Sequence, residues 1–486
     1  MKLKNGGVQE LQEFRSYRSF CLLGENDGYL EVDSGRSWIL CRREWLSHSA
    51  TPELLSSMLY DTEAIIEIDK AHVWHPFTQM RDWMEPDHQP IVLVAGHGPW
   101  LEDSLGKRYL DGNSSIWTNI HGHNHPILNQ AIRDQLNQVA HTSFLGFTNP
   151  TAVELARRLV AVLPGSSLTR VFFSDDGSTA IEVAIKMAVQ YFLQNGRPQK
   201  MGFISFENAY HGDTLGASSL GGISIFHDRF KSHQFPVTRI ASIESLRAID
   251  GSRVAGLVIE PLIQGAAGMR LWPAGMLKTL RGWCDENGVL LIFDEVMTGF
   301  GRTGRYFACQ HEDVFPDLLA IAKGLTGGYL PLAATLTTEG VFNGFLGSIP
   351  EVRTFFYGHS YCGNPLGCAA ALANLEIFEK EGVLEKLQPK IEYLAERLHG
   401  LEVLPNVKEI RRCGFIAAIE VAQKNRDQFD WRDQVGPQIC LAARRHGLLT
   451  RPLGDVIVLM LPLCVSQGDI DVAVDAIGKG ITEVCG

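Results

Sequence analysis

An apolar strand, a polar turn and an amphipathic helix follow one another in RVFFSDDGSTAIEVAIKMAVQYFLQ, residues 170–194. Residues 170–173 (RVFF) have the composition of a buried strand, and SDDGST then turns the chain. A strand that leads through a turn into a helix is the repeating unit of a parallel sheet wrapped by helices, so the stretch predicts an α/β fold. The helix over 178–194 keeps its apolar residues on one face, namely Ile181, Ile185, Ala188 and Phe192.

Short apolar runs with the length of buried strands recur along the chain. They lie at residues 202–206 (GFISF), 255–259 (AGLVI), 289–293 (VLLIF), 318–322 and 331–337. A long helix is expected at 366–381. The C-terminal region predicts a smaller α+β domain, with helices at 384–398 and 435–446 and short strands at 415–421 and 456–461.

The chain has 486 residues and a formal charge of −11, from 44 Lys and Arg against 55 Asp and Glu. This acidic balance argues against a nucleic-acid partner and against attachment to an anionic membrane. No apolar run approaches the roughly 20 residues that span a bilayer. No apolar stretch follows Lys2 and Lys4 as it would in a secretory signal. The ten cysteines form no CxxC pair, which predicts reduced thiols in a cytoplasmic protein.

Residues 1–60 differ from the rest of the chain because they show neither a helical nor an alternating period. We expect them to form an N-terminal extension outside the main fold. Either the segment is flexible, or it lies upstream of a true start at Met58.

Each predicted central strand is followed at once by polar residues. SDDGST follows 170–173, and ENAYHGDT follows 202–206. Because ligands of open α/β sheets bind beyond the carboxyl ends of the strands, these positions predict one shared site. Any one of the groups could instead cap a helix or lie in a solvated loop. The next strands along the chain end at Glu260, Asp294 and Lys323.

The SDDGST turn has the features of a phosphate site. Gly177 and Ser178 lie between a strand and a helix, and Thr179 with Glu182 has the spacing of a capping box. The N-terminus of a helix offers free N–H groups and partial positive charge, which suit a phosphate. There is no GK[ST] sequence, so the turn is not a P-loop. The alternative is a capped helix without a ligand.

Asp294 and Lys323 carry the chemistry that we expect at this edge. A carboxylate at the end of VLLIF stays ionised if it meets a positive partner, either a protonated pyridine nitrogen or an arginine. Burial at a strand end would lower the pKa of Lys323 and make it a nucleophile toward an aldehyde, although a lone lysine is usually a solvated charge. Tyr210 could stack on a flat ring or pack in the core.

Two further motifs resemble cofactor sites but are rejected. Residues 299–304 (GFGRTG) match GxGxxG, yet no helical period follows them, as a dinucleotide-binding turn requires. His121, His123 and His125 lie in HGHNHP without a carboxylate or cysteine to complete a zinc site. We therefore predict a turn at 121–126 and no metal.

Six segments together resemble the class III (omega) aminotransferases, which are pyridoxal-phosphate enzymes of fold type I. They read SDDGSTAIEVAIKMA, YHGDTLGASS, VIEPLIQGAAGM, IFDEVMTGFGRTGR, IAKGLTGGYLPLAATLTT and HSYCGNPLGCAAALANL. The resemblance runs from about Asp69 to the C-terminus, and it is the joint pattern that is specific. It implies a large domain with a mostly parallel seven-stranded sheet and a smaller α+β domain. The implied bounds are 61–125 and 376–486 for the two parts of the small domain and 126–375 for the large pyridoxal-phosphate-binding domain.

The resemblance also implies a role for each matching site residue. Lys323 would hold the cofactor aldehyde and move a proton, and Asp294 would pair with the ring nitrogen. Tyr210 would stack on the ring. The phosphate would be held by Gly177, Ser178 and, from the neighbouring subunit of a homodimer, Ser360.

Two flanking segments resemble the branch of the family that aminates 8-amino-7-oxononanoate in biotin biosynthesis. They are HVWHPFTQM at 72–80 and GLLTRPLGDVIVLMLPL at 447–463. Arg451, in the second segment, would pair with the carboxylate of the keto substrate. The implied alternative is another omega-aminotransferase that acts on lysine, a diamine or an omega-amino acid.

Three positions depart from the adenosylmethionine-dependent branch. That branch usually has Tyr where Phe77 stands, Trp-Trp where this chain has Ile116 and Trp117, and Gly-Pro-Thr at 358–360, which here read Gly358, His359 and Ser360. All three positions line the expected substrate pocket. The resemblance therefore leaves two amino donors open, S-adenosylmethionine and lysine.

Overall fold

The computed structural model describes residues 20–23, 30–33, 60–425 and 427–486. Most of the predicted extension over 1–60 lies outside the described residues. Within it, Phe20–Leu23 (β1) pairs antiparallel with Leu30–Asp33 (β2), and the continuous description begins at Tyr60. The chain divides into two compact units. One contains the described residues of Met1–Ala95 together with Leu101–Arg108, and the other contains Gly96–Trp100 and Tyr109–Gly486. The domain bounds at 125 and 375 stay predictions.

Polar contacts tie together the first unit. Asp61 caps the helix Thr62–His72 (α3), and a shorter helix follows at Met80–Met84 (α4). The Asp69 carboxylate accepts hydrogen bonds from His75 Nε2 at 2.9 Å and from the Trp83 indole at 2.9 Å, which ties the segment between the two helices to α3. Phe77, inside this segment, has a left-handed backbone with φ 51° and an exposed side chain. Strands follow at Leu93–His97 (β3) and Trp100–Asp103 (β4).

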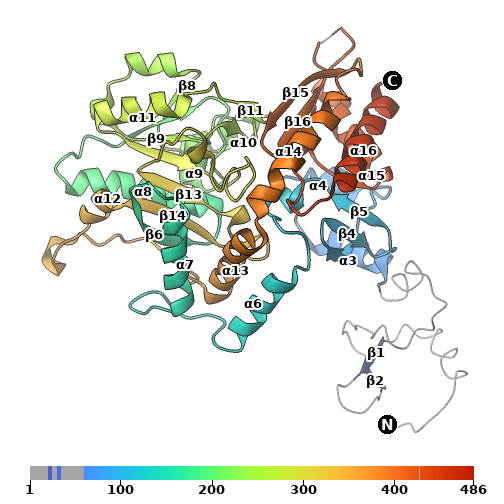
Figure 1. Cartoon of the computed structure of the whole chain (residues 1–486), viewed down its shortest axis with the longest axis horizontal. Helices are drawn as coiled ribbons and strands as arrows, with labels where there is room; N and C mark the ends of the chain where they lie inside the picture. The colour runs from blue at the N-terminus through green and yellow to red at the C-terminus, as the bar shows by residue number, and fades with distance from the viewer. Residues whose placement is uncertain (1–19, 24–29, 34–59, 426) are drawn as a thin grey trace, which may run out of the picture. The chain divides into compact units, whose positions relative to one another are not determined.

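A seven-stranded sheet organises the second unit, as the sequence predicted (Figure 1). Its order is β6-β14-β13-β12-β9-β7-β8, and β14 alone runs antiparallel to its neighbours. The carboxyl ends of the other six strands therefore lie at one edge. The strands are Leu168–Ser174 (β6), Gly202–Phe206 (β7), Thr238–Ile240 (β8), Val254–Ile259 (β9), Leu290–Asp294 (β12), Leu318–Ile321 (β13) and Ala333–Thr338 (β14).

Alternate residues of the central strands pack into two different cores, so the sheet is buried on both faces. In β12, Leu291 and Phe293 join one apolar cluster, whereas Leu290 and Ile292 join the other. The helix Gly177–Gln194 (α8) contributes Ala184 and its neighbours to the second cluster. Other helices of this region are Pro126–Leu136 (α6), Pro150–Ala161 (α7), Leu215–Leu220 (α9), Ser224–His227 (α10), Met276–Asn287 (α11), Glu339–Asn343 (α12) and Pro365–Glu381 (α13).

The C-terminal region forms the expected smaller α+β layer within the second unit. Four antiparallel strands have the order β15-β16-β19-β18. Leu110 and Asp111 of β5 (Arg108–Asp111) pair in parallel with β17 (Leu448–Leu449). The remaining elements are β15 (Val407–Cys413), β16 (Ile416–Val421), β18 (Pro452–Leu453), β19 (Val456–Leu459), α14 (Val383–His399), α15 (Val435–Arg445) and α16 (Gln467–Cys485).

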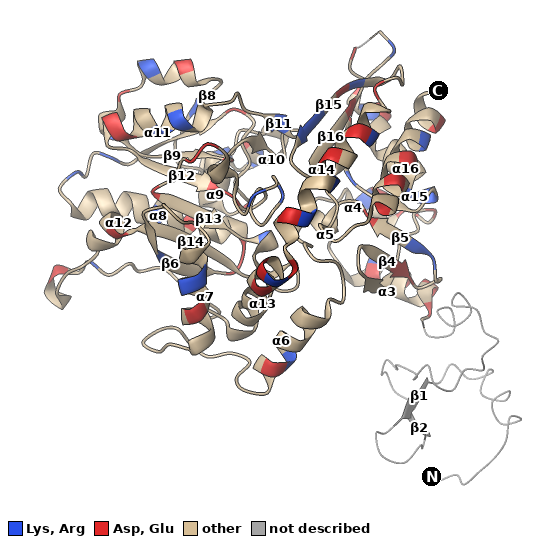
Figure 2. Cartoon of the chain, viewed as in Figure 1, with Lys and Arg blue, Asp and Glu red and all other residues tan. Residues whose placement is uncertain are grey.

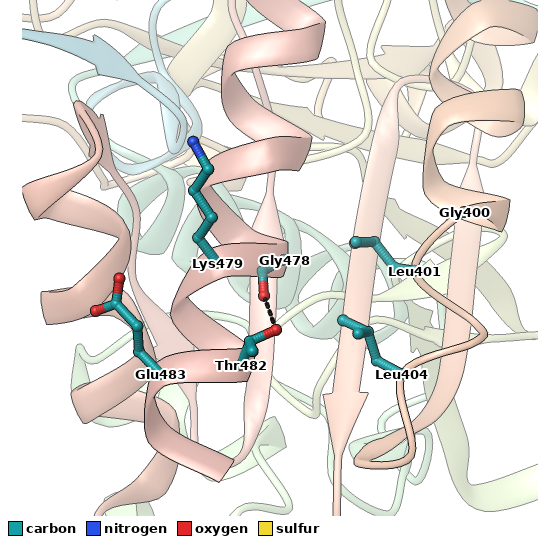
Figure 3. Close-up of a pocket in the computed structure, with 7 residues that line it drawn as sticks. All are labelled: Gly400, Leu401, Leu404, Gly478, Lys479, Thr482 and Glu483. Carbon is teal, nitrogen blue, oxygen red and sulfur yellow. Dashed lines mark hydrogen bonds between the residues drawn. The ribbon is translucent and has the colours of Figure 1, made fainter. Parts of the chain in front are cut away.

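The outer helices of this layer carry mixed charges, with acidic and basic residues interspersed along α14 and α16 (Figure 2). An open hollow lies between the end of α14 and α16 (Figure 3), and none of its lining residues belongs to the strand ends. No helix in the described part of the chain is long and apolar enough to cross a membrane. The hollow is lined by Gly400, Leu401, Leu404, Gly478, Lys479, Thr482 and Glu483.

Candidate active site

Lys323 lies directly beyond β13, at the start of the 3-10 turn Lys323–Thr326 (η7). Its backbone is left-handed, with φ 42°. Its ammonium nitrogen Nζ lies 4.7 Å from the centroid of the Trp117 ring, a cation–π distance. Burial lowers the pKa of Lys323, while the carboxylates of Asp294 and Glu260 partly oppose that shift. The site therefore favours a neutral amine more than water does.

Asp294 is the last residue of β12, and its side chain is 8% exposed. His211 donates a hydrogen bond from Nδ1 to one carboxylate oxygen at 2.8 Å, and the Val296 N–H donates to the other at 3.1 Å. The far ring nitrogen of His211, Nε2, is buried without a hydrogen-bond partner among the described residues. A carboxylate fixed from two sides is preorganised to face a positive group.

The loop after β7 links Tyr210 to the start of α8. The Tyr210 hydroxyl donates to Asp213 at 2.5 Å, and the Asp213 N–H donates to Ser178 Oγ at 3.1 Å. Burial, together with Asp213, raises the pKa of Tyr210, which keeps the phenol protonated. Ser178 and Tyr210, predicted from separate motifs, are thus joined through Asp213.

Glycines make a close-packed cradle at the N-terminus of α8. A Cβ atom on Gly177 would lie 2.7 Å from Val296, and one on Gly212 would lie 2.2 Å from Ser178 Oγ. Only glycine therefore lets the three loops approach this closely. Asp176 caps the helix and forms a capping box with Thr179.

The predicted capping box between Thr179 and Glu182 is wrong. The Glu182 carboxylate instead accepts hydrogen bonds from the Thr214 hydroxyl at 2.6 Å and from the Ala217 N–H at 3.1 Å. Glu182 thus anchors the start of α9 to α8, and the residue at the cap is Asp176. The spacing of a capping box did not distinguish Asp176–Thr179 from Thr179–Glu182, because an acidic residue stands three positions before Thr179 and another three positions after it.

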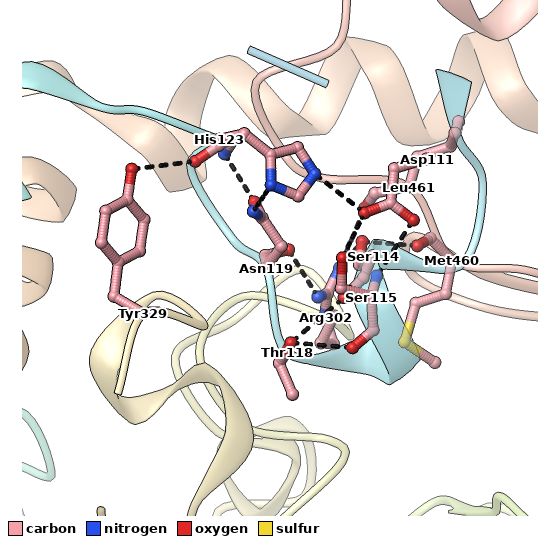
Figure 4. Close-up of polar contacts among 11 residues, drawn as sticks. Asp111, Ser114, Ser115, Thr118, Asn119, His123, Arg302, Tyr329, Met460 and Leu461 are labelled. Atoms are coloured by element: carbon pink, nitrogen blue, oxygen red, sulfur yellow. Dashed lines mark hydrogen bonds and ion pairs between the residues drawn. The ribbon is translucent and has the colours of Figure 1, made fainter. Parts of the chain in front are cut away.

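Trp117 reaches Lys323 from an unusual backbone turn. All four residues of α5 (Ser114–Trp117) have positive φ, between 44° and 67°, although none is glycine. Asp111 accepts hydrogen bonds from the N–H and the hydroxyl of Ser115 (Figure 4). Asn113 accepts from the Trp117 indole at 2.7 Å. Such strained conformations persist only where surrounding contacts hold them, and here they fix the indole.

Arg302, from the rejected GFGRTG motif, supports the same turn (Figure 4). Its side chain is 1% exposed, and burial lowers its pKa to about 9. It donates to the Ser114 hydroxyl at 3.3 Å, to the Leu461 carbonyl at 2.9 Å and to the Asn119 carbonyl at 2.8 Å. The motif therefore connects three segments that are distant in sequence.

The three histidines of HGHNHP point to different partners. His121 contacts Asn374 at 2.7 Å, His123 contacts Asp111 at 3.0 Å, and His125 lies 3.7 Å from Glu381. The described residues contain no group of three or more metal-ligating side chains.

The remaining predicted residues lie in exposed segments. Gly358 and Ser360 belong to an exposed loop whose His359 lies 3.4 Å from Asp175, beside the turn that leads into α8. The Arg451 guanidinium is exposed, and among the described residues it makes no hydrogen bond or ion pair. Phe77 lies in the first compact unit, where it is 58% exposed.

Three contributors make contacts that the sequence did not indicate. His211 and Asp213 lie in the YHGDT segment, yet nothing in that spacing indicates that they bind Asp294 and Tyr210. Glu260 was noted only as a strand end. Its carboxylate accepts hydrogen bonds from the Gly265 N–H at 2.8 Å and the Tyr210 N–H at 3.5 Å, and burial raises its pKa to about 7.

We expect Glu260 to make the stability of the protein depend on pH. The unfolded chain loses this proton near pH 4.5, whereas the folded chain keeps it to about pH 7. The free energy of unfolding therefore falls by about 3 kcal/mol as the pH rises through this window, and a Glu260→Gln variant escapes that loss. Denaturant midpoints of both proteins between pH 4.5 and 8 measure the difference.

The matched control is Glu154→Gln. Arg157 holds the pKa of the exposed Glu154 below its usual range, so ionisation of Glu154 stabilises the folded chain as the pH rises. Glu154→Gln therefore loses stability relative to wild type over this pH range, whereas Glu260→Gln gains it. Parallel stability profiles for Glu260→Gln and wild type would show that the Glu260 carboxyl ionises as it does in water.

The side chains described above fit pyridoxal phosphate. An amine suited to bond an aldehyde, Lys323, and an anion suited to pair with a ring nitrogen, Asp294, lie at the ends of adjacent strands. Tyr210 supplies an aromatic ring, and the cradle at Gly177 presents the N-terminus of α8 to a phosphate.

Comparisons with known proteins agree with this reading. Residues 83–481 match the family aminotransferase class-III. An adenosylmethionine-8-amino-7-oxononanoate aminotransferase from Geobacter sulfurreducens is 47% identical over 88% of this chain and 99% of its own. The crystal structure of the enzyme of that name from Methanocaldococcus jannaschii has a TM-score of 0.85 and 39% identity over 87% of this chain and all of its own.

A third relative carries the cofactor. An amine transaminase from an uncultivated Pseudomonas species, solved in its PLP-bound form, has a TM-score of 0.80 and 32% identity, and it covers 85% of this chain and 99% of its own. The family match spans most of the chain. The chain belongs to the class III aminotransferase family, whose members of fold type I transfer amino groups with pyridoxal phosphate.

Proposed function

We propose that the protein transfers an amino group from S-adenosylmethionine to 8-amino-7-oxononanoate and so forms 7,8-diaminononanoate for biotin synthesis. The observation that carries the catalytic part is the meeting of Lys323 and Asp294 at one sheet edge, where the Asp294 carboxylate opposes the fall in the pKa of Lys323 that burial causes. Two relatives, 47% and 46% identical to this chain, bear the name of this activity, which supports the choice of substrate.

Lys323 and Asp294 have complementary tasks in the proposed reaction. When bound, pyridoxal phosphate supplies an aldehyde carbon that bonds amino groups and a ring that withdraws electrons from them. Lys323 Nζ would bond the aldehyde of this group in the resting enzyme. As a free neutral amine, Lys323 would accept the proton that leaves the donor carbon and would later return a proton. Asp294, held by His211, keeps the ring nitrogen protonated.

Other residues orient the cofactor in this proposal. Tyr210 lies against one ring face, and its hydroxyl stays protonated on Asp213. The N–H groups of Gly177 and Ser178 at the start of α8 bind the phosphate. Ser360 of a partner subunit adds its hydroxyl to that phosphate. Large exposed apolar side chains in the loops that precede α7 and α13, such as Leu145, Phe147 and Phe356, support a homodimer. A sedimentation mass of twice 53.8 kDa for the holoenzyme is the result that a homodimer predicts.

The substrate pocket is assigned by the same reasoning. The free guanidinium of Arg451 pairs with the carboxylate of 8-amino-7-oxononanoate through two hydrogen bonds. Trp117, fixed beside Lys323, forms one wall, and Gly358 contributes to the donor side. We place the reaction in the cytoplasm, in agreement with the scattered free cysteines.

Lysine is a second candidate for the amino donor. Phe77 has no hydroxyl, and Ile116, in place of a large aromatic residue, is 47% exposed in the left-handed turn. The smaller Ile116 side chain enlarges the pocket relative to the branch that uses adenosylmethionine, and the missing hydroxyl of Phe77 is a second difference from that branch. The keto acceptor is supported by a different residue, Arg451, and does not depend on this choice.

An Arg451→Ala variant is expected to raise the KM for 8-amino-7-oxononanoate by about 100-fold with little change in the maximal rate, because a bidentate pair with a carboxylate contributes about 2–3 kcal/mol. Arg451→Lys keeps the positive charge but cannot form two parallel hydrogen bonds with the carboxylate, so its KM should lie between those of wild type and Arg451→Ala. Single-turnover absorbance measurements, with adenosylmethionine and lysine supplied separately, also identify the donor.

The control for this experiment is Arg432→Ala, because Arg432 is exposed, pairs with Asp430 at 3.0 Å and lies over the ring of its neighbour Trp431. It should stay within two-fold of wild type. If neither donor reacts and a simple diamine does, the protein is a different omega-aminotransferase and the substrate assignment is wrong.

A further inference from the structure

The turn that carries Lys323 has a backbone that needs support. Lys323 has φ 42°, and the preceding Ala322 has φ −160° and ψ −143°, outside the regular regions. Two consecutive left-handed glycines, Gly327 and Gly328, close the turn. A left-handed lysine is unfavourable by itself, so contacts with neighbouring elements must stabilise this conformation.

Asn374, on α13, supplies such contacts. Its side chain is fully buried, and its amide nitrogen Nδ2 donates to the Gly324 carbonyl at 3.0 Å and to the Leu325 carbonyl at 2.9 Å. These are the first two carbonyls after Lys323. A single side chain thus ties both of them to a helix that lies 50 residues further along the chain.

His121 fixes the orientation of the Asn374 amide. Its Nε2 lies 2.7 Å from Asn374 Oδ1, and burial lowers the pKa of His121 to about 3, so the ring is neutral and must donate from Nε2. The amide oxygen then faces His121 and the amide nitrogen faces the turn. The adjacent Ile120 N–H donates to the Gly327 carbonyl at 3.2 Å, so the same segment supports the far end of the turn.

We propose that Asn374, oriented by His121, is a positioning residue that holds the Lys323 turn in its reactive conformation. This gives His121 of the HGHNHP motif a task in the reaction. Without the amide, the Leu325 carbonyl loses its donor, the Gly324 carbonyl keeps the Gly327 N–H of the same turn, and the link from the turn to α13 is lost, so the turn is free to relax. Because Lys323 starts the turn, a small relaxation moves its Nζ, and displacements near 1 Å can lower a rate by about 100-fold.

The test is the Asn374→Ala holoenzyme. We expect kcat to fall by about 10- to 100-fold with each donor while KM changes less than three-fold, since Asn374 has no direct contact with substrate. Hydrogen exchange of the peptide that spans 322–328, followed by mass spectrometry, should accelerate at least ten-fold. The exchange measurement does not depend on turnover.

Three further variants separate positioning from a general loss of stability. Asn406→Ala removes another buried amide, which donates to the Ala422 carbonyl at 2.9 Å, and should leave kcat and the 322–328 exchange unchanged. His121→Leu should give a partial effect, and His121→Gln, which keeps an N–H donor, should restore most of the rate. These variants also serve if Asn374→Ala does not fold.

The inference rests on the proposed role of Lys323, and the two can fail separately. Equal kcat and equal exchange in Asn374→Ala and Asn406→Ala would overturn the positioning role. Fast exchange of 322–328 with cofactor attached at a lysine other than Lys323 would instead overturn the proposed function and leave the structural support of the turn intact.

Discussion

Replacement of Lys323 by alanine is expected to reduce turnover by at least about 1,000-fold, because one amine both holds the cofactor and moves the proton. The variant should also lose the covalent bond between protein and cofactor. Borohydride reduction followed by peptide mapping measures this bond. In the wild-type protein the pyridoxyl group should be found on the peptide that contains Lys323, and in the variant on none.

Lys200 is an internal control for this experiment. Burial lowers its pKa as well, but its Nζ donates to three backbone carbonyls, those of Gly251 at 2.7 Å, Val254 at 3.1 Å and Asn287 at 3.0 Å. A lysine engaged in this way has no lone pair to offer. Label on Lys200, or a reducible bond that survives in Lys323→Ala, would contradict the assignment of the nucleophile.

The large sheet could be predicted because its strands are buried on both faces and therefore read as continuous apolar runs. The predicted strand at 202–206 coincides with β7, and the run at 318–322 differs from β13 by one residue. Thr238–Ile240 (β8) was missed because it has only three residues, two of them exposed, at the edge of the sheet. Such a strand has no apolar period to detect.

Part of the site follows from the same reasoning. Asp294 and Lys323 end adjacent parallel strands, so their proximity is a consequence of sheet topology and needs no knowledge of the loops. The bond between His211 and Asp294 joins residues 83 positions apart, and its existence depends on how the loop after β7 folds back. The left-handed turn at Ser114–Trp117 contains no glycine, so the sequence offers no signal for it.

Asp294→Asn is expected to lower kcat by about 1,000-fold, because the amide has nearly the shape of the carboxylate but no charge to keep the ring nitrogen protonated. His211 Nδ1 can still donate to the amide oxygen, whereas the Val296 N–H loses its acceptor, so the side chain keeps its contact with His211. Removal of the proton from the donor carbon then becomes the slowest step. A donor deuterated at that carbon should show a larger kinetic isotope effect than in wild type.

Glu295, the next residue, provides the matched control. It is also a fully buried carboxylate, but its oxygens accept from the Thr298 hydroxyl and from the N–H groups of Ala308 and Cys309, at 2.7–2.8 Å. Glu295→Gln should therefore lower the denaturant midpoint and leave the isotope effect as it is. A kcat within five-fold of wild type and an unchanged isotope effect in Asp294→Asn would contradict the proposed role. Asp294 would then have a structural role only, and another group would have to keep the ring nitrogen protonated.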